Sequence, residues 1–114
     1  MGVTPTSYAK AVIEAGADII GTNCGNGMER MTGIVEEIRS VFPDRPILVH
    51  ANAGLPVNVD GKDIYKETPA EMADLVPAVI KAGANIIGGC CGTNPDHIRA
   101  IREKIISMGL DYKP

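Results

Sequence analysis

The chain contains one short segment twice, and this repeat restricts the architectures it can adopt. Residues 15–21 (AGADIIG) match residues 82–88 (AGANIIG) everywhere except at Asp18 and Asn85. In both copies a glycine ends a helical pattern and a β-branched run follows, which predicts a helix end and then a buried strand. Extending the match places Cys24 opposite Cys91. The sequence therefore predicts repeated βα units, each followed by a cysteine.

The rest of the chain alternates between helical and strand patterns. Helices are predicted at 6–15, at 28–42, at 68–82 and from residue 94, with strands at 17–23, 46–51 and 85–89. Residues 57–67 form a polar stretch with a turn signal at Asp60-Gly61. Pro77 is expected to kink the third helix or weaken one of its turns. The last helix is predicted to turn four side chains inward: Ile98, Ile101, Ile105 and Ile106.

This order, a helix followed by three βα units, predicts an α/β fold with a parallel sheet and right-handed crossovers. A closed eight-stranded barrel needs about 250 residues, and the chain has 114. Three parallel strands leave both edges of their sheet uncovered. We therefore expect a second copy of the chain, or a complementary barrel half, to complete the sheet.

Composition excludes several classes of partner. The formal net charge is −3 and aromatic residues make up 4% of the chain, whereas nucleic-acid binders carry basic stripes and stacking aromatics. No apolar run reaches the length of a membrane span. Three cysteines do not form the even framework of a secreted disulfide protein, so a reducing cytoplasm is expected. In that compartment cysteines more often bind metals or take part in catalysis.

The cysteines are the main candidates for chemistry. Cys24 lies in the segment GTNCG, and Cys90 and Cys91 lie in GGCCG, both at predicted strand exits. Three thiolates on a tetrahedral zinc ion leave one position open, and such an ion suits a substrate thiol better than water. Asn23, which directly precedes Cys24, and Asn52, at the end of the middle strand, are candidates for binding substrate or orienting the ligands. The alternatives are buried apolar cysteines, a strained adjacent disulfide, or an iron–sulfur site, which more often shows C-x₂-C spacing.

Structural roles are expected for most other polar and sulfur-containing residues. His50 is expected to pack or meet solvent within its strand, and His97 is expected to be exposed in the first turn of the last helix. Glu71 and Asp96 are interpreted as partners of helix dipoles. Three methionines are expected to fill the core: Met28, Met31 and Met72. Four charged residues are expected to form a solvated loop face: Lys62, Asp63, Lys66 and Glu67.

Four segments in order, GTNC at 21–24, NAGLP at 52–56, TPAEM at 68–72 and GGCCGT at 88–93, resemble the homocysteine S-methyltransferase family. The resemblance is nearest to the homocysteine-binding barrel of cobalamin-dependent methionine synthases. It implies that residues 1–114 form one partial domain, the last three βα units of a (βα)₈ barrel. It also implies a zinc ion held by Cys24, Cys90 and Cys91, on which a homocysteine thiolate attacks a methyl donor to give methionine.

The resemblance implies a methylcobalamin or methyltetrahydrofolate donor that acts through parts outside this chain. The family's first five strands have no counterpart in the sequence. Three hypotheses follow. The chain is a methyltransferase segment or subunit, a metal-binding or oligomerising module without turnover, or one half of a split enzyme.

Overall fold

A three-stranded parallel sheet organises the protein, whose computed structural model describes residues 2–24 and 27–110. The strands are β1 (Ile20–Cys24), β2 (Ile47–Ala51) and β5 (Ile86–Gly89), in the order β1-β2-β5. Ile20 pairs with Ile47, and Leu48 pairs with Ile86. Their β-branched residues suit a pleated, buried surface. The three predicted strands are confirmed, with starts one to three residues later than expected.

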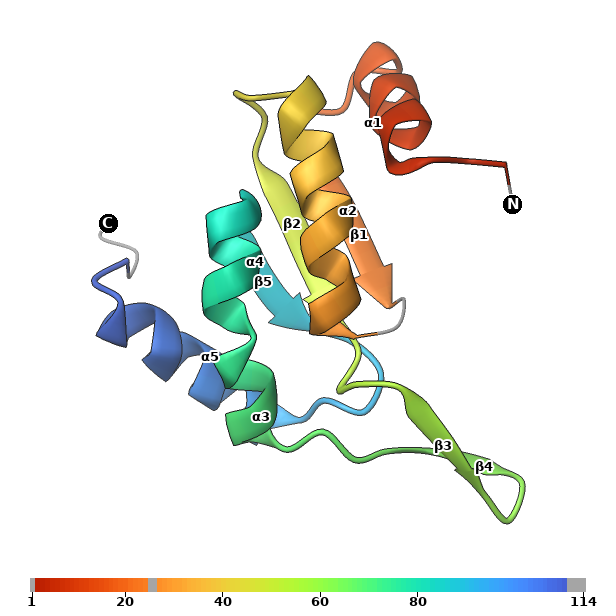
Figure 1. Cartoon of the computed structure of the whole chain (residues 1–114), viewed down its shortest axis with the longest axis vertical. Helices are drawn as coiled ribbons and strands as arrows, with labels where there is room; N and C mark the ends of the chain where they lie inside the picture. The colour runs from red at the N-terminus through yellow and green to blue at the C-terminus, as the bar shows by residue number, and fades with distance from the viewer. Residues whose placement is uncertain (1, 25–26, 111–114) are drawn as a thin grey trace.

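Within residues 2–24 and 27–110, five helices accompany the sheet: α1 (Pro5–Glu14), α2 (Met28–Val41), α3 (Pro69–Asp74), α4 (Val76–Ala82) and α5 (Pro95–Ser107). In Figure 1, α2 and α4 lie side by side over one face of the sheet. Helix α1 packs on α2 and β1, while α5 packs on α3 and β5. The predicted order of a helix followed by three βα units is therefore confirmed.

Three helices begin with side-chain caps that the sequence encodes. Thr4, Thr68 and Asn94 each accept a hydrogen bond from the backbone of the first turn, and each is followed by a proline. Glu71 returns the bond, since its carboxylate accepts from the Thr68 backbone N–H at 3.1 Å. These reciprocal bonds satisfy donors that a helix start otherwise leaves without partners.

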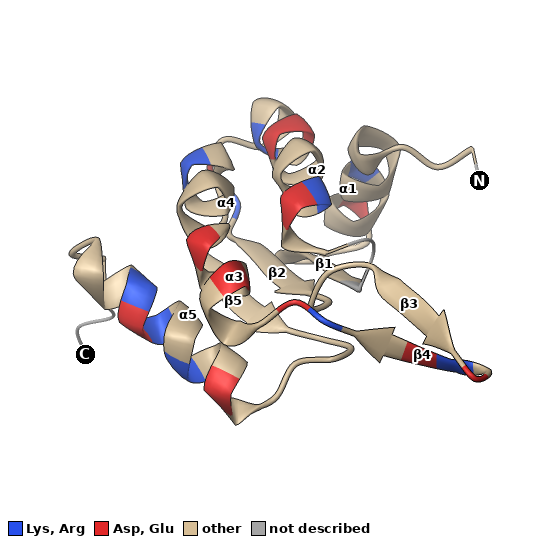
Figure 2. Ribbon diagram, turned by 60° about the horizontal axis from the view of Figure 1, so that its bottom comes forward, with Lys and Arg blue, Asp and Glu red and all other residues tan. Residues whose placement is uncertain are grey.

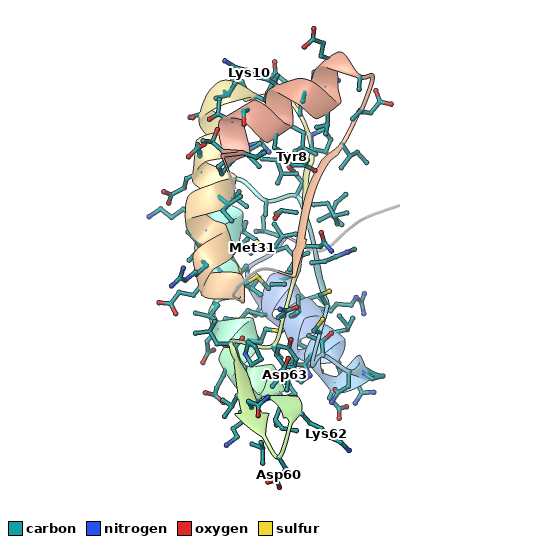
Figure 3. The ribbon with its side chains drawn as sticks, turned by 90° about the vertical axis from the view of Figure 1, so that its right-hand side faces the viewer. Tyr8, Lys10, Met31, Asp60, Lys62 and Asp63 are labelled. Atoms are coloured by element: carbon teal, nitrogen blue, oxygen red, sulfur yellow. The ribbon has the colours of Figure 1, made fainter. Side chains whose placement is uncertain are left out.

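The core lies between the sheet and the helices. Along β2 the side chains alternate, with Ile47, Val49 and Ala51 fully buried and the residues between them half-buried. The three methionines expected in the core, Met28, Met31 and Met72, are all buried. In Figure 3, Met31 lies between α2 and the sheet. One face of the sheet is thus filled by helices, and the opposite face presents Leu48 and His50.

The predicted helix at 68–82 is two helices. Helix α3 ends at Asp74 and α4 begins at Val76, with Leu75 at the junction. Pro77 has no backbone N–H, and its ring would clash with the carbonyl of Ala73 in a continuous helix. The predicted weakening at Pro77 is therefore confirmed as a break.

The polar stretch after β2 is a β-hairpin, where the sequence analysis predicted only a loop with a turn. Strands β3 (Pro56–Val59) and β4 (Lys62–Tyr65) pair antiparallel around Asp60 and Gly61, which both have positive φ angles. Asp-Gly is the preferred sequence for this two-residue turn. The hairpin is nearly all exposed, and its tip residues Asp60, Lys62 and Asp63 lie away from the core in Figure 3. The two strands of the hairpin have four residues each and are almost entirely exposed. Their apolar and polar side chains therefore form too short a pattern to predict strands.

The last helix differs from its prediction. Ile101 is buried and Ile105 packs partly on the core, but Ile98 and Ile106 are 46% and 44% exposed. An apolar groove of about 570 Å³ lies between α5 and the outer edge of β5. Its lining includes Ile86, Ile98, Ile101, Ile105 and Leu110. Helix α5 covers only part of the edge of β5. Some apolar side chains of the helix, such as Ile98, therefore remain exposed.

No helix within the described ranges is long and apolar enough to cross a membrane. Charges of both signs occur on the same helices, as α2 and α5 show in Figure 2.

Candidate metal centre

The candidate ligands lie at the carboxyl edge of the sheet, the end toward which the arrowheads of β1, β2 and β5 point in Figure 1. Cys24 is the last residue of β1, and Cys90 and Cys91 directly follow β5. The backbone of Cys24 pairs with Ala51, which pairs in turn with Gly89. The fold therefore brings all three cysteine positions to one edge, with β2 between them. The side chain of Cys24 lies outside the part of the structure that is described.

The Sγ atoms of Cys90 and Cys91 lie 4.0 Å apart, and no disulfide joins these two residues. Cys90 is half-buried and Cys91 is exposed. Among the side chains that the structure describes, no group of three or more His, Cys, Asp or Glu residues could hold a metal ion. The described geometry thus places two sulfur atoms close together on one loop.

Several hydrogen bonds among the described residues hold the cysteine loop. The N–H of Cys90 donates to the carbonyl of Ala51 at 2.8 Å, so the ladder with β2 extends one residue past β5. The N–H of Cys91 donates to Asn52 Oδ1 at 3.0 Å, and the Cys91 carbonyl accepts from the N–H of Ala53 at 2.9 Å. Thr93 Oγ1 donates to the Cys90 carbonyl at 2.6 Å. Both cysteine backbones are therefore fixed by the strand exit and loop of β2.

Asn52, a predicted site residue, is 4% exposed. Its bond to Cys91 joins the NAGLP segment to the GGCCGT segment. Asn23, the other predicted residue, is exposed on β1 and pairs in register with His50. Paired residues project to the same face of a sheet. Asn23 and His50 therefore lie on the face that the helices leave uncovered, next to the cysteine edge.

Two tight approaches shape this end of the molecule. A Cβ at Gly88 would lie 2.9 Å from His50 Nε2, so His50 packs over the glycine backbone. Gly92 has a φ of +80°, and a Cβ there would collide with the Cβ of Tyr65 on β4. The base of the hairpin therefore rests directly on the cysteine loop. Sequence analysis missed this contact, because nothing local in the chain links residue 65 to residue 92.

His97 is buried, with 4% exposure, and its predicted exposure is wrong. Its Nε2 lies 2.8 Å from the carbonyl oxygen of Glu67, and its Nδ1 lies 3.2 Å from Asn94 Oδ1. The imidazole joins the start of α5 to the segment before α3. The signal was present in the sequence, because His97 stands three residues after the cap Asn94, where a reciprocal capping partner is placed.

Glu67 also differs from its prediction as a solvated residue. It is half-buried, and its Oε1 has no hydrogen-bond partner among the described residues. Burial raises the pKa of the Glu67 carboxyl, the negative charges of Glu71 and Glu29 raise it further, and His97 opposes them. The carboxylate borders a hollow of about 400 Å³ between the loops after β1 and β2. Among the described carboxylates at this edge, Glu67 is the one whose pKa is raised by burial.

The sequence of the chain matches the model of the family named homocysteine S-methyltransferase over residues 1–105. It is 39% identical over 96 residues to the methionine synthase of Mycobacterium leprae (strain TN), an alignment that covers 83% of this chain and 8% of that protein. It is 35% identical over 99 residues to the methionine synthase of Mycobacterium tuberculosis (strain ATCC 25618 / H37Rv), again 8% of that protein. The chain thus spans about a twelfth of the length of these relatives.

The structure is similar to part of delta-aminolevulinic acid dehydratase (porphobilinogen synthase) from Toxoplasma gondii ME49, a TIM-barrel enzyme solved with its product porphobilinogen. The TM-score is 0.62 at 17% identity, and the match covers 95% of this chain and 38% of that one. This likeness concerns the fold alone. The match to the family over residues 1–105 confirms the predicted resemblance, and the chain belongs to the homocysteine S-methyltransferase family.

Proposed function

We propose that the chain supplies the zinc site of a homocysteine S-methyltransferase, with Cys24, Cys90 and Cys91 as the ligands. The observation that carries the proposal is the placement of all three cysteine positions at one sheet edge, with two sulfurs 4.0 Å apart. Two sulfurs bound at 2.3 Å to a tetrahedral zinc ion are separated by about 3.8 Å. The described pair therefore fits zinc after a small side-chain adjustment.

Zinc held by three thiolates would supply one open position, at which a substrate thiol loses its proton yet stays nucleophilic. The described residues would prepare this position. Asn52 and Ala53 fix the backbone of Cys91, and Ala51 fixes that of Cys90. Backbone fixed in this way sets the ligand directions before the metal binds, which lowers the ordering cost of binding.

The proposed substrate is homocysteine, which would approach from the uncovered face of the sheet. Asn23 and His50 lie on that face in one register row, next to the cysteine edge. We assign Asn23 to the substrate or to the orientation of the Cys24 loop, and Asn52 to the orientation of Cys91. His50 packs over Gly88, and this placement supports a structural role for its ring.

We further propose that residues 1–114 are one partial (βα)₈ barrel domain. The repeated segment aligns Ile20 with Ile87, yet in the sheet Ile87 lies in the row of Val49 and Thr22. From β1 to β5, which are two strand pairings apart, equivalent residues of the repeat are therefore shifted by two positions along the strands. A barrel of eight strands and shear eight has a stagger of about one residue per strand. Helices on one face of the sheet agree with this arrangement.

A complementary barrel half, or a second copy of this chain, would complete the sheet. The apolar groove along the outer edge of β5 supports such a neighbour. The methyl group would come from methylcobalamin or methyltetrahydrofolate bound by other parts of the enzyme. We propose the cytoplasm as the location, because three cysteines do not form the even framework of a secreted disulfide protein.

A module that binds metal or oligomerises without turnover is the second candidate. The open apolar groove along the outer edge of β5 supports it. One experiment distinguishes the methyltransferase, including its split form, from the module without turnover. Homocysteine methylation is measured with and without a polypeptide that carries the first five strands of the barrel. Methylation that appears only with this second polypeptide supports the split enzyme, and zinc binding with no methylation in either case supports the module.

The zinc assignment is tested by metal analysis of the reduced chain after zinc loading and removal of free metal. One zinc per site is expected, with loss of the metal in Cys24→Ser, Cys90→Ser and Cys91→Ser. His50→Gln is the matched control, because it removes a metal-binding side chain near the same edge and should retain zinc. Full zinc content in the variant that lacks all three cysteines would refute the assignment.

A further inference from the structure

His97 is a buried histidine to which the proposed zinc site assigns no role. Its side chain is 4% exposed, and it lies in the first turn of α5. Its Nε2 lies 2.8 Å from the carbonyl oxygen of Glu67, and its Nδ1 lies 3.3 Å from the backbone nitrogen of Asn94. A carbonyl oxygen only accepts hydrogen bonds, so Nε2 donates, and Nδ1 accepts from the N–H of Asn94. Both ring nitrogens are therefore engaged, and the imidazole is not a candidate metal ligand.

Three hydrogen bonds connect this imidazole to the backbone of Cys91. The ring donates to the carbonyl of Glu67, whose own N–H donates to the carbonyl of Ala53 at 3.3 Å. The N–H of Ala53 in turn donates to the carbonyl of Cys91 at 2.9 Å. Ala53 is fully buried, which shields the two bonds that it makes from water. The ring is thus connected to the cysteine loop through the segment before α3 and the strand exit of β2.

These bonds fix both ends of the stretch from Cys91 to His97. Its first residue is bound to Asn52 as well as Ala53, because Asn52 Oδ1 accepts from the N–H of Cys91 at 3.0 Å. Its last residue is bound to Glu67, and Glu67 is bound to Ala53. Loss of the imidazole bond would therefore release Glu67 from α5 and weaken the support of Ala53 and Cys91. Groups that orient metal ligands without binding the metal typically change its affinity by about 10- to 100-fold.

We propose that His97 is a positioning residue of the metal site and that its Nε2–H holds Cys91 in place through Glu67 and Ala53. This inference rests on the proposed function, because it assigns His97 to the zinc ion that the three cysteines would bind. A helix cap alone would be a different role. In that case only the bond between Nδ1 and the N–H of Asn94 would matter, and substitutions would change stability without changing metal affinity.

Two substitutions separate the two bonds of the ring. The amide nitrogen of glutamine lies near the place of Nε2, so His97→Gln keeps a donor for Glu67 and loses the acceptor for Asn94. The amide oxygen of asparagine lies near the place of Nδ1, so His97→Asn keeps the acceptor for Asn94 and is too short to reach Glu67. Zinc affinity of the full reduced chain, measured by competition with a chelator, should fall about 10-fold in His97→Asn and about twofold or less in His97→Gln. The opposite order, equal losses, or normal affinity in His97→Asn would overturn the proposal.

A second measurement needs no metal. In the zinc-free chain, amide hydrogen exchange at Glu67 and Ala53 should be about 10-fold faster in His97→Asn than in His97→Gln, because both amides depend on the support of the ring. Exchange at Ile47, whose N–H donates to Asn85 Oδ1 at the amino edge of the sheet, is the matched control and should be the same in both variants. Urea denaturation establishes that each variant is folded. A His97→Asn chain that does not fold would overturn the proposal, because the ring would then serve folding rather than the site.

The two measurements distinguish the failure of this inference from the failure of the proposed zinc function. A parent chain that binds no zinc, together with faster exchange at Ala53 in His97→Asn, would refute the zinc function and support the positioning of the cysteine loop by His97. A parent chain that binds zinc, together with unchanged exchange at Ala53 and unchanged zinc affinity in His97→Asn, would overturn the positioning role alone.

Discussion

The two ends of the three-stranded sheet are held in different ways. At the amino edge one side chain, Arg39 of α2, joins the helix to the starts of β2 and β5. Its guanidinium donates to four carbonyls and one amide oxygen at 2.6–3.0 Å: those of Phe42, Pro43, Arg45, Gly83 and Asn85. At the carboxyl edge no one side chain has this role. The cysteine loop is fixed by separate hydrogen bonds to Ala51, Asn52 and Ala53 and by the packing of Tyr65 on Gly92.

This difference assigns stability to the amino edge of the sheet and reactive groups to its carboxyl edge. In barrels and open α/β sheets the carboxyl ends of the strands carry the reactive groups, and the amino ends carry stability. The amino edge here has a dense, charge-assisted network around a half-buried arginine. The carboxyl edge has the adjacent cysteines Cys90 and Cys91, a carboxylate oxygen without a described partner and short glycine-rich turns. We therefore expect substitutions at the two edges to change different measurements.

Arg39→Met should give the largest loss of stability. Removing the guanidinium breaks five hydrogen bonds at once and is expected to lower the free energy of unfolding by about 3 kcal/mol. Urea denaturation measures this loss. Arg39→Lys should recover only part of it, because an ammonium group lacks the planar fork. Zinc affinity of the folded variant should remain unchanged, and a parallel loss of zinc would break the separation of the two edges.

The two glycines of the repeat sharpen the comparison. Gly16 and Gly83 have φ angles of +108° and +129°, so alanine at either position is expected to cost about 1 kcal/mol of backbone strain. A Cβ at Gly83 would also lie 2.7 Å from Arg39 Nε, whereas nothing lies within 4 Å at Gly16. Gly83→Ala should therefore destabilise the chain more than Gly16→Ala in the same urea experiment. Equal losses would mean that Arg39 moves aside without cost.

Asn52→Ala tests the carboxyl edge. The variant leaves the N–H of Cys91 without its bond to Asn52, at an expected cost of about 1 kcal/mol in unfolding free energy. The larger change should appear in zinc affinity, measured by competition with a chelator, because Cys91 loses its positioning. Asn52→Asp keeps an acceptor oxygen and should recover part of the affinity. A variant with reduced stability and normal zinc affinity would assign Asn52 to folding alone.

Glu67 gives the smallest expected effect and a pH signature. Its pKa is raised in the folded state, chiefly by burial, so the folded chain holds this proton to higher pH than the unfolded chain. The free energy of unfolding should therefore fall as pH rises from the ordinary pKa of 4.5 through the raised value. Glu67→Gln should remove this dependence and be slightly more stable at neutral pH. An unchanged pH profile in the variant would show that another group produces the dependence.

Local sequence patterns predicted the helices and the three strands of the parallel sheet. The glycines of the repeat, the cap at Thr68 and the apolar spacing of α2 act within a few residues, so their consequences could be read from the chain. Pro77 acts on one preceding turn, and the break that it causes was expected in kind. The family resemblance, which rests on four short segments, is confirmed by the match over residues 1–105.

The features that sequence reasoning missed depend on residues far apart in the chain. His97 is buried because Glu67, thirty residues earlier, places its carbonyl beside the imidazole. Tyr65 meets Gly92 across the hairpin and the last crossover. The exposure of Ile98 depends on what lies beyond the edge of β5, and periodicity reports only that a face is apolar. Apart from the hairpin of β3 and β4, packing partners rather than helix or strand identity were the unpredictable part.

Our central proposal is that Cys24, Cys90 and Cys91 would hold a zinc ion and that the homocysteine thiol would become its fourth ligand. X-ray absorption at the zinc edge, recorded on the zinc-loaded chain before and after addition of homocysteine, tests this most directly. The account predicts three sulfur ligands and one lighter ligand that become four sulfurs at about 2.3 Å. A first shell that homocysteine does not change, or one with fewer than three sulfurs before it is added, would contradict the account.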